Sequence, residues 1–104
     1  MFQLGAALLD GCVLAVLARG DAYGYSLTQE IKAVISVSES TLYPVLRRLQ
    51  RDGFLTTYDQ AFNGRNRRYY RITPEGRAHL DETTCAWSAY KGAVDSLFEG
   101  SDPA

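Results

Sequence analysis

Residues 64–76 constrain the fold of this chain more than any other part of its sequence. They read G-R-N-R-R-Y-Y-R-I-T-P-E-G. Residues 67–72 have the aromatic, alternating composition of a β-strand, with Tyr70 and Ile72 on the side expected to face a core. Thr73 and Pro74 then form a helix start, because a threonine hydroxyl can cap a helix and proline suits its first position. A strand that leads directly into a long helix, residues 74–98, is therefore predicted.

Helical spacing of apolar residues predicts three further helices before this segment. The first covers residues 8–17, the second begins at Gly24 or Tyr25, and the third covers residues 38–52. Ser38 is a suitable N-cap for the third helix, which also contains Pro44, a residue that removes one backbone donor. The apolar face of the second helix consists of Leu27, Ile31 and Val34, and that of the third of Leu42, Leu46 and Leu49.

A hairpin between the third and last helices completes the pattern. Residues 54–58 read as its first strand, and the loop of about residues 59–66 is expected to be longer than a two-residue turn. Three helices, two strands and a long helix are the element order of a winged helix-turn-helix with a helical extension. We therefore predict an α+β fold, mostly α, with the winged helix-turn-helix DNA-binding domain in residues 1–76. Residues 77–104 would form a C-terminal dimerisation helix and a short tail.

The net charge of −1 conceals a basic region. Residues 47–77 carry eight arginines and three acidic residues, a balance of +5, whereas the chain on both sides is acidic. Because this basic region coincides with the predicted third helix and hairpin, we interpret it as a nucleic-acid surface rather than a solvated face.

Other classes of protein find little support in the composition. Apolar residues make up 46% of the chain, but no run approaches the roughly 18 needed for a membrane span. The apolar N-terminus lacks the basic region of a signal peptide. Its two cysteines, Cys12 and Cys85, do not have a metal-binding spacing. We expect a cytoplasmic protein with no membrane partner, no cofactor and no metal.

Three motifs resemble the PadR family of bacterial transcriptional regulators. Tyr23-Gly24-Tyr25 with Leu27 is similar to the opening of the family's second helix. Residues 38–44, S-E-S-T-L-Y-P, resemble the start of its recognition helix, with Ser40 where the family usually has glycine, and residues 64–76 resemble its wing signature. The resemblance covers nearly the whole chain. It implies a homodimer that binds a palindromic operator, usually as a repressor. A single helix after the wing is similar to the compact, multidrug-sensing branch.

The residues expected to touch DNA lie at the start of the third helix, in the wing and at the start of the second helix. Hydroxyls and helix amides can reach phosphates or base edges, and the forked guanidinium of arginine suits phosphates and narrow grooves. Arg48 and Arg51 are expected near phosphates or in solvent, and Arg68 is expected to pair with a carboxylate. The predicted DNA contacts are Tyr23, Tyr25, Ser38, Ser40, Thr41, Tyr43, Arg47, Asn63, Gly64, Arg65 and Arg67.

A heptad pattern in the last helix predicts pairing with a second copy. One apolar position recurs every seven residues and a second lies three residues further on, which is typical of helix pairing. We expect this helix to pack on the first helix of the other subunit, with packing on its own first helix as the second choice. The predicted interface consists of Leu80, Thr83, Trp87, Tyr90, Val94 and Leu97.

Trp87, the single tryptophan of the chain, is also a candidate ligand contact. The resemblance implies that an aromatic residue here can stack on a flat ligand in a pore between subunits, although Trp87 could simply fill the interface. Lys91 near the pore would favour neutral or anionic aromatics over cations. The predicted ligand residues are Trp87, Lys91, Leu4, Ala7, Leu8, Asp10 and Gly11.

Three other interpretations compete with that of a DNA-binding regulator. The chain could sense oxidants through Cys85, although a cysteine in an apolar helix is usually inert. It could be a winged-helix module that binds only proteins. An enzyme has little support, because the single histidine, His79, is expected at the surface and no catalytic motif is present.

Overall fold

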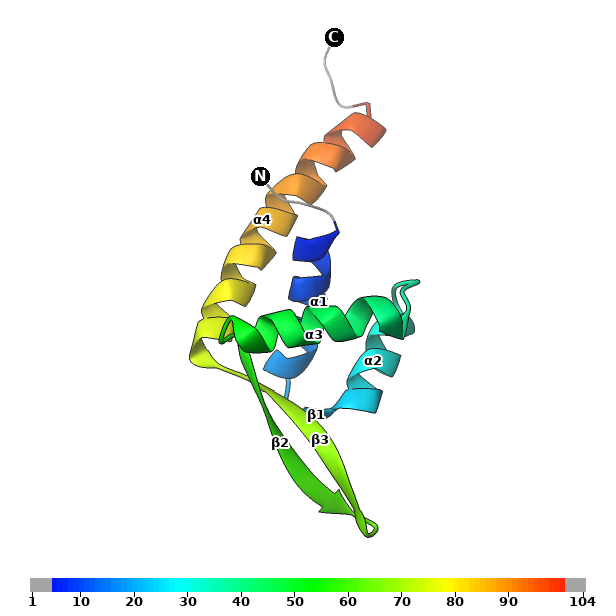
Figure 1. Ribbon diagram of the computed structural model, residues 1–104. Coiled ribbons are helices and arrows are strands. Elements are labelled where there is room, and N and C mark those ends of the chain that lie inside the picture. The colour runs from blue at the N-terminus through cyan, green and yellow to red at the C-terminus, as the bar shows by residue number, and fades with distance from the viewer. Residues whose placement is uncertain (1–4, 101–104) are drawn as a thin grey trace.

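The computed structural model describes residues 5–100 and confirms a mostly helical fold with a small antiparallel sheet (Figure 1). Leu4, a predicted ligand residue, lies outside the described residues. Each predicted helix is present, and the last has the predicted bounds. The elements are α1 (Ala6–Ala18), β1 (Ala22–Tyr23), α2 (Gly24–Lys32), α3 (Glu39–Arg51), β2 (Leu55–Phe62), β3 (Arg65–Ile72) and α4 (Pro74–Phe98).

The sheet has three strands in the order β1-β3-β2, and both pairings are antiparallel. The expectation of a long hairpin loop was wrong. Phe62 pairs with Arg65, so that Asn63 and Gly64 alone form the turn. Their φ angles of 52° and 79° are both positive, as a type I′ turn requires. β2 continues to Phe62 because its backbone pairs with β3, although Asp59 and Gln60 are poor strand formers.

The core lies between the first three helices and the base of the sheet. Tyr70 and Ile72 of β3 are buried there, as predicted, and α3 runs through Pro44 as one helix. Val34 does not share the buried face of α2: it follows the end of that helix and is 83% exposed. The buried apolar residues are Val13, Leu14, Leu17, Leu27, Ile31, Leu42, Val45, Leu46, Leu49, Leu55, Tyr70 and Ile72.

The start of α4 is fixed against the junction of α3 and β2. Thr73 caps α4 by accepting a hydrogen bond from the amide of Gly76 at 2.9 Å, and its hydroxyl donates to the carbonyl of Gly53 at 2.7 Å. A Cβ atom on Gly76 would lie 2.0 Å from the carbonyl oxygen of Phe54. The absence of a side chain at Gly76 therefore allows α4 to lie directly on this backbone.

The first half of α4 packs on α1 of its own chain, the arrangement that the sequence interpretation placed second. A Cβ atom on Gly11 of α1 would lie 2.9 Å from the Cγ2 of Thr83, so the two helices approach closely there. Leu80 packs against the edge of the core. The second half of α4 extends beyond α1 (Figure 1). The side chains on α4 are therefore divided between an intrachain contact and a projecting segment.

The contact at Gly76 generates a stability prediction. We expect Gly76→Ala to lower the free energy of unfolding by about 3 kcal/mol, because the new methyl group overlaps the Phe54 carbonyl. Gly92→Ala in the same helix is the matched control. Its Cβ would meet nothing within 4 Å, and alanine should raise helix stability by about 0.5–1 kcal/mol. Urea unfolding at one protein concentration measures both, and equal effects would contradict the close contact.

Candidate nucleic-acid interface

The face of α3 opposite its buried stripe is exposed. Leu42, Val45, Leu46 and Leu49 are buried, and helical spacing places a polar set on the other side. Tyr43 is 36% exposed and does not fill the core. The exposed residues of α3 are Ser40, Thr41, Tyr43, Pro44, Arg47, Gln50 and Arg51.

A hydroxyl cluster lies at the N-terminus of α3. The Ser38 Oγ accepts a hydrogen bond from the amide of Thr41 at 3.3 Å, which confirms Ser38 as the cap. The same oxygen lies 2.9 Å from the Ser40 Oγ and 3.2 Å from the Thr41 Oγ1. Lys32 donates to Glu39 at 2.8 Å, and this contact lowers the pKa of the Glu39 carboxyl. Hydroxyl donors at the positive end of a helix dipole suit a phosphate group.

A groove of about 540 Å³ separates α3 from the sheet and the start of α2. It brings together four predicted DNA contacts from three parts of the chain: Tyr23, Tyr25, Tyr43 and Arg47. Gly24, Arg68 and Tyr70 complete its lining. The groove therefore presents two arginines, one on α3 and one on β3, among aromatic rings.

Arg68 is the residue of this groove that the sequence interpretation missed. It does lie 3.7 Å from the carboxylate of Asp59, as predicted, but both side chains are largely exposed. A surface pair of this kind holds an arginine only weakly. Alternation along β3, which puts Arg68 on the same face as Tyr70, was the signal that could have identified it.

The wing arginines have two different environments. Arg65 is exposed beside the Asn63-Gly64 turn at the far end of the hairpin (Figure 1). The guanidinium carbon of Arg67 lies between two aromatic rings, 4.6 Å from the ring centre of Tyr23 and 4.2 Å from that of Phe62. Arg67 consequently joins the wing to the start of α2 by cation–π contacts while remaining partly exposed.

The remaining tyrosines of the hairpin, Tyr58 and Tyr69, pack within the sheet. The rings of Tyr58 and Tyr69 stack with centres 5.5 Å apart. The Tyr58 hydroxyl donates to Asp21 at 2.7 Å, and the Arg71 Nε donates to the same carboxylate at 3.0 Å. These donors hold the pKa of Asp21 below its usual value, with Arg71 the larger cause. The network fixes the hairpin to the segment between α1 and β1.

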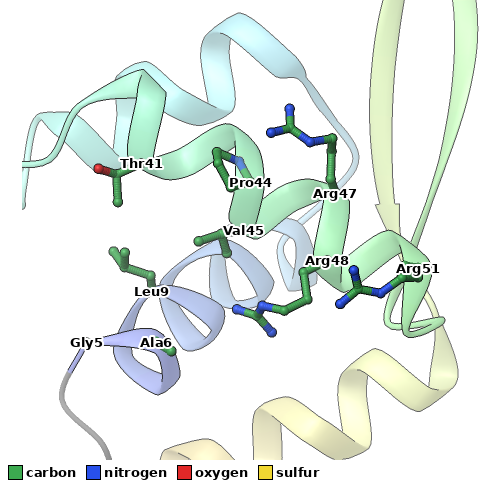
Figure 2. Close-up of a pocket in the computed structure, with 9 residues that line it drawn as sticks. All are labelled: Gly5, Ala6, Leu9, Thr41, Pro44, Val45, Arg47, Arg48 and Arg51. Atoms are coloured by element: carbon green, nitrogen blue, oxygen red, sulfur yellow. The ribbon is translucent and has the colours of Figure 1, made fainter.

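Three residues differ from their predicted environments. Asp10 does not line an open space: it is buried and accepts two hydrogen bonds from the Arg48 guanidinium, at 3.1 and 2.5 Å. Arg48 is therefore paired with this carboxylate rather than free in solvent, and the Asp10 carboxylate raises the pKa of Arg48. His79 is half-buried, with its ring stacked 4.3 Å from that of Phe54. Figure 2 shows Arg48 directed towards α1 and Arg47 on the other side of α3.

The hollow drawn in Figure 2 lies between α3 and the start of α1 and has a volume of about 640 Å³. Apolar residues and three arginines, Arg47, Arg48 and Arg51, line it. It continues the basic surface of α3 on the side away from the wing. The other lining residues are Gly5, Ala6, Leu9, Thr41, Pro44 and Val45.

Only some of the predicted ligand and dimer residues lie together in the structure. Leu8, Gly11 and Trp87 line an apolar hollow of about 210 Å³ between α1 and α4, together with Cys12, Ala15, Leu80 and Thr84. Ala7 and Lys91 are not part of its lining. Among the predicted dimer residues, Leu97 is 82% exposed, and the other five, Leu80, Thr83, Trp87, Tyr90 and Val94, are half-buried.

The two cysteines occupy different environments. Burial raises the pKa of the Cys12 thiol, which disfavours the reactive thiolate. Cys85 is exposed on α4. The redox alternative, which concerns Cys85, stays a hypothesis.

The sequence is similar to known transcriptional regulators. The profile of the family described as "Transcriptional regulator PadR-like family" matches residues 13–82. The chain is 44% identical over 82 residues to "Transcriptional regulator Rv3488" of Mycobacterium tuberculosis, covering 78% of this chain and 75% of that protein.

Solved structures agree with the fold. The crystal structure of smu.1704 from Streptococcus mutans has a TM-score of 0.86 and 42% identity, and the match covers 95% of this chain and 93% of that one. The PadR-like regulator BC4206 from Bacillus cereus has a TM-score of 0.82 and 30% identity, with 93% and 97% covered. Within residues 5–100 no helix is long and apolar enough to cross a membrane.

Proposed function

This chain belongs to the PadR-like family of transcriptional regulators, and we propose that it is a homodimeric repressor that binds a palindromic operator through α3 and the wing. The observation that supports this most directly is the groove between α3 and the sheet, where Tyr43 and Arg47 of α3 face Arg68 of β3. A cationic groove beside an exposed helix face suits the edge of a DNA major groove. A regulator of promoters would act in the cytoplasm of a bacterium.

We assign base contacts to the exposed face of α3. A helix fits the major groove, about 12 Å wide, and the side chains near its N-terminus usually reach the base edges. Arg47 is exposed on this face, and a guanidinium can donate two hydrogen bonds to guanine. The hydroxyls of Ser38, Ser40 and Thr41 would contact the adjacent phosphates.

The wing would grip the phosphates beside the same groove. The two-residue turn at Asn63 and Gly64 makes the end of the hairpin narrow, and Arg65 is exposed next to it. Arg67 would contribute its charge from a fixed position, because two rings hold its guanidinium. Tyr23 and Tyr25, at the entry to α2, would line the phosphate path.

A second copy is proposed to cover the projecting half of α4. Leu97 and Phe98 are more than 80% exposed there, on a helix whose heptad positions are otherwise half-buried. Two such helices could bury these side chains against each other and against the partner's α1. The two-fold symmetry of the pair would match a palindromic operator.

The hollow beside Trp87 is the proposed effector site. Its lining is almost wholly apolar, with small residues on α1 opposite the tryptophan ring, which suits a flat aromatic molecule. Because the hollow lies between α1 and α4, an occupant would change how α4 sits on the DNA-binding domain. Such a change would alter the spacing of the two α3 helices and release the operator.

Operator binding is tested on genomic fragments selected by pull-down and sequencing. Arg47→Ala and Arg65→Ala should each weaken binding about tenfold, because each removes a charge-assisted contact. For Arg65→Ala the slope of log K against log salt concentration should fall by about one unit, as expected when a phosphate contact is lost.

Arg19→Ala is the matched control for this loss of charge. Arg19 pairs with Glu30 of α2, and helical spacing places it on the side of α1 away from its buried face. Its removal should leave operator affinity unchanged. Equal weakening by all three substitutions would show that general charge, rather than the proposed interface, accounts for binding.

Dimer formation is tested by sedimentation equilibrium at micromolar concentration. The wild type should have twice the mass of the 11.5 kDa chain. Val94→Asp with Leu97→Asp should yield a folded monomer, because the two charges fall at heptad positions of the projecting segment. Asp95→Ala, next to them but outside the heptad positions, should leave the dimer intact. A monomeric wild type would refute the proposal.

Effector binding is tested by the fluorescence of Trp87. Planar aromatic compounds should quench it, and Ala15→Leu should weaken the quenching at least tenfold because the larger side chain fills the hollow. Ala89→Leu, at an exposed position of α4 outside the hollow, is the control. A broad panel of flat compounds without any quenching would contradict an aromatic effector.

A further inference from the structure

A buried carboxylate on α1 holds the DNA-facing helix by a two-point contact. Asp10 is 6% exposed, and its Oδ2 and Oδ1 accept hydrogen bonds from the Arg48 Nη1 and Nη2 at 3.1 and 2.5 Å. Paired hydrogen bonds between two planar groups define an angle as well as a distance. This contact therefore fixes the rotation of α3 on α1 in a way that apolar side chains alone do not.

Burying the Asp10 carboxylate costs desolvation free energy, which its contact with Arg48 offsets. Its neighbours on the buried face of α1 are Val13, Leu14 and Leu17, so the carboxylate interrupts an otherwise apolar surface. Replacing a buried ion pair by apolar side chains of similar size is often neutral or stabilising, so stability alone does not account for the pair. In some proteins a buried polar pair specifies one geometry among several that the apolar contacts allow, and we assign that role to this pair.

The Arg48 side chain points towards α1 and not towards the exposed face of α3. Helical spacing puts it beside Arg47 and Arg51, yet Figure 2 shows its side chain turned to α1. With both Nη atoms on Asp10, its guanidinium is directed away from the exposed face of α3. Its effect on DNA would then act through the placement of Arg47 rather than through a phosphate.

The same carboxylate is in reach of α4. The His79 Nε2 lies 3.7 Å from the Asp10 Oδ2, and the imidazole stacks on Phe54, which follows the end of α3. Three helices thus converge on one side chain: α1 supplies the acid, α3 the arginine and α4 the histidine. The Asp10 side chain therefore contacts both α4, to which we assign dimerisation, and α3, to which we assign DNA binding.

We propose that Asp10 and Arg48 are positioning residues for operator recognition, which set the angle at which α3 presents Arg47 to the bases. This inference rests on the proposed function. It assigns to Arg48 an indirect role in sequence reading and no contact with DNA. Sequence-specific binding should depend on the pair, whereas binding to arbitrary DNA, which needs only charge near phosphates, should not.

The decisive variant carries Asp10→Leu together with Arg48→Met. This apolar replacement removes the two-point contact without leaving a buried charge, so the chain should stay folded with a midpoint of unfolding at or above that of the wild type. Operator affinity should fall at least tenfold, as when one well-aligned base contact is lost. Affinity for a scrambled duplex, and the slope of log K against log salt for that duplex, should not change.

Two results would overturn the inference. If Arg48 touches a phosphate, both duplexes lose affinity and the salt slope falls by about one unit. If the pair only supports the fold, operator affinity stays at the wild-type value. Arg48→Lys gives a second measurement that does not depend on the double variant. It keeps the charge but loses the fork, so it should also reduce operator affinity and leave scrambled binding intact.

A separate result identifies failure of the proposed function itself. A wild-type chain that binds no genomic fragment refutes the DNA-binding proposal and this inference with it. Wild-type binding combined with an unaffected double variant refutes the positioning role alone.

Discussion

Burial of four side chains of α3 against α1 and the sheet decides which face of this helix is exposed. Leu42, Val45, Leu46 and Leu49 occupy one side of the helix and are at most 8% exposed. Removing each from water contributes on the order of 1.5–3 kcal/mol, far more than a surface ion pair, so this face cannot rotate outward. This burial determines that Arg47 and the groove beside the sheet lie on the exposed side of α3, and the contact of Asp10 with Arg48 is left to set the angle of the helix.

The arginines that make the middle of the chain basic are not equivalent in the structure. Arg48 and Arg71 each pair with a carboxylate, on Asp10 and Asp21, and Arg67 lies between two rings. A charge count of the sequence treats all of them as available to an anionic partner. The structure instead divides them into groups that organise the domain and groups, such as Arg47 and Arg65, that face outward.

The main elements could be predicted because their signals are local. A serine cap, a leucine stripe and a threonine-proline helix start each depend on a few neighbouring residues. The hairpin was misjudged because Asp59 and Gln60 are poor strand formers that nonetheless pair across the sheet. β1 was missed because two residues show no periodicity, and their pairing with β3 is a tertiary contact.

In the candidate site, too, features set by local spacing could be predicted and long-range contacts could not. Exposure of Tyr43 and Arg47 follows from the helical period, so it could be stated from the sequence. The contact of Asp10 with Arg48 spans 38 positions, and that of His79 with Phe54 depends on how α4 folds back, so neither has a local signal. Long-range pairing, rather than residue type, was the missing information.

Gly76, at the start of α4, affects the direction in which this long helix leaves the domain. A helix of 25 residues is roughly 37 Å long, so a rotation of 10° about one end moves the other by about 6 Å. Gly76 sets that end directly on the backbone of Phe54. In a pair joined through α4, the number of base pairs between half-sites would then depend on the close contact of Gly76 with this backbone.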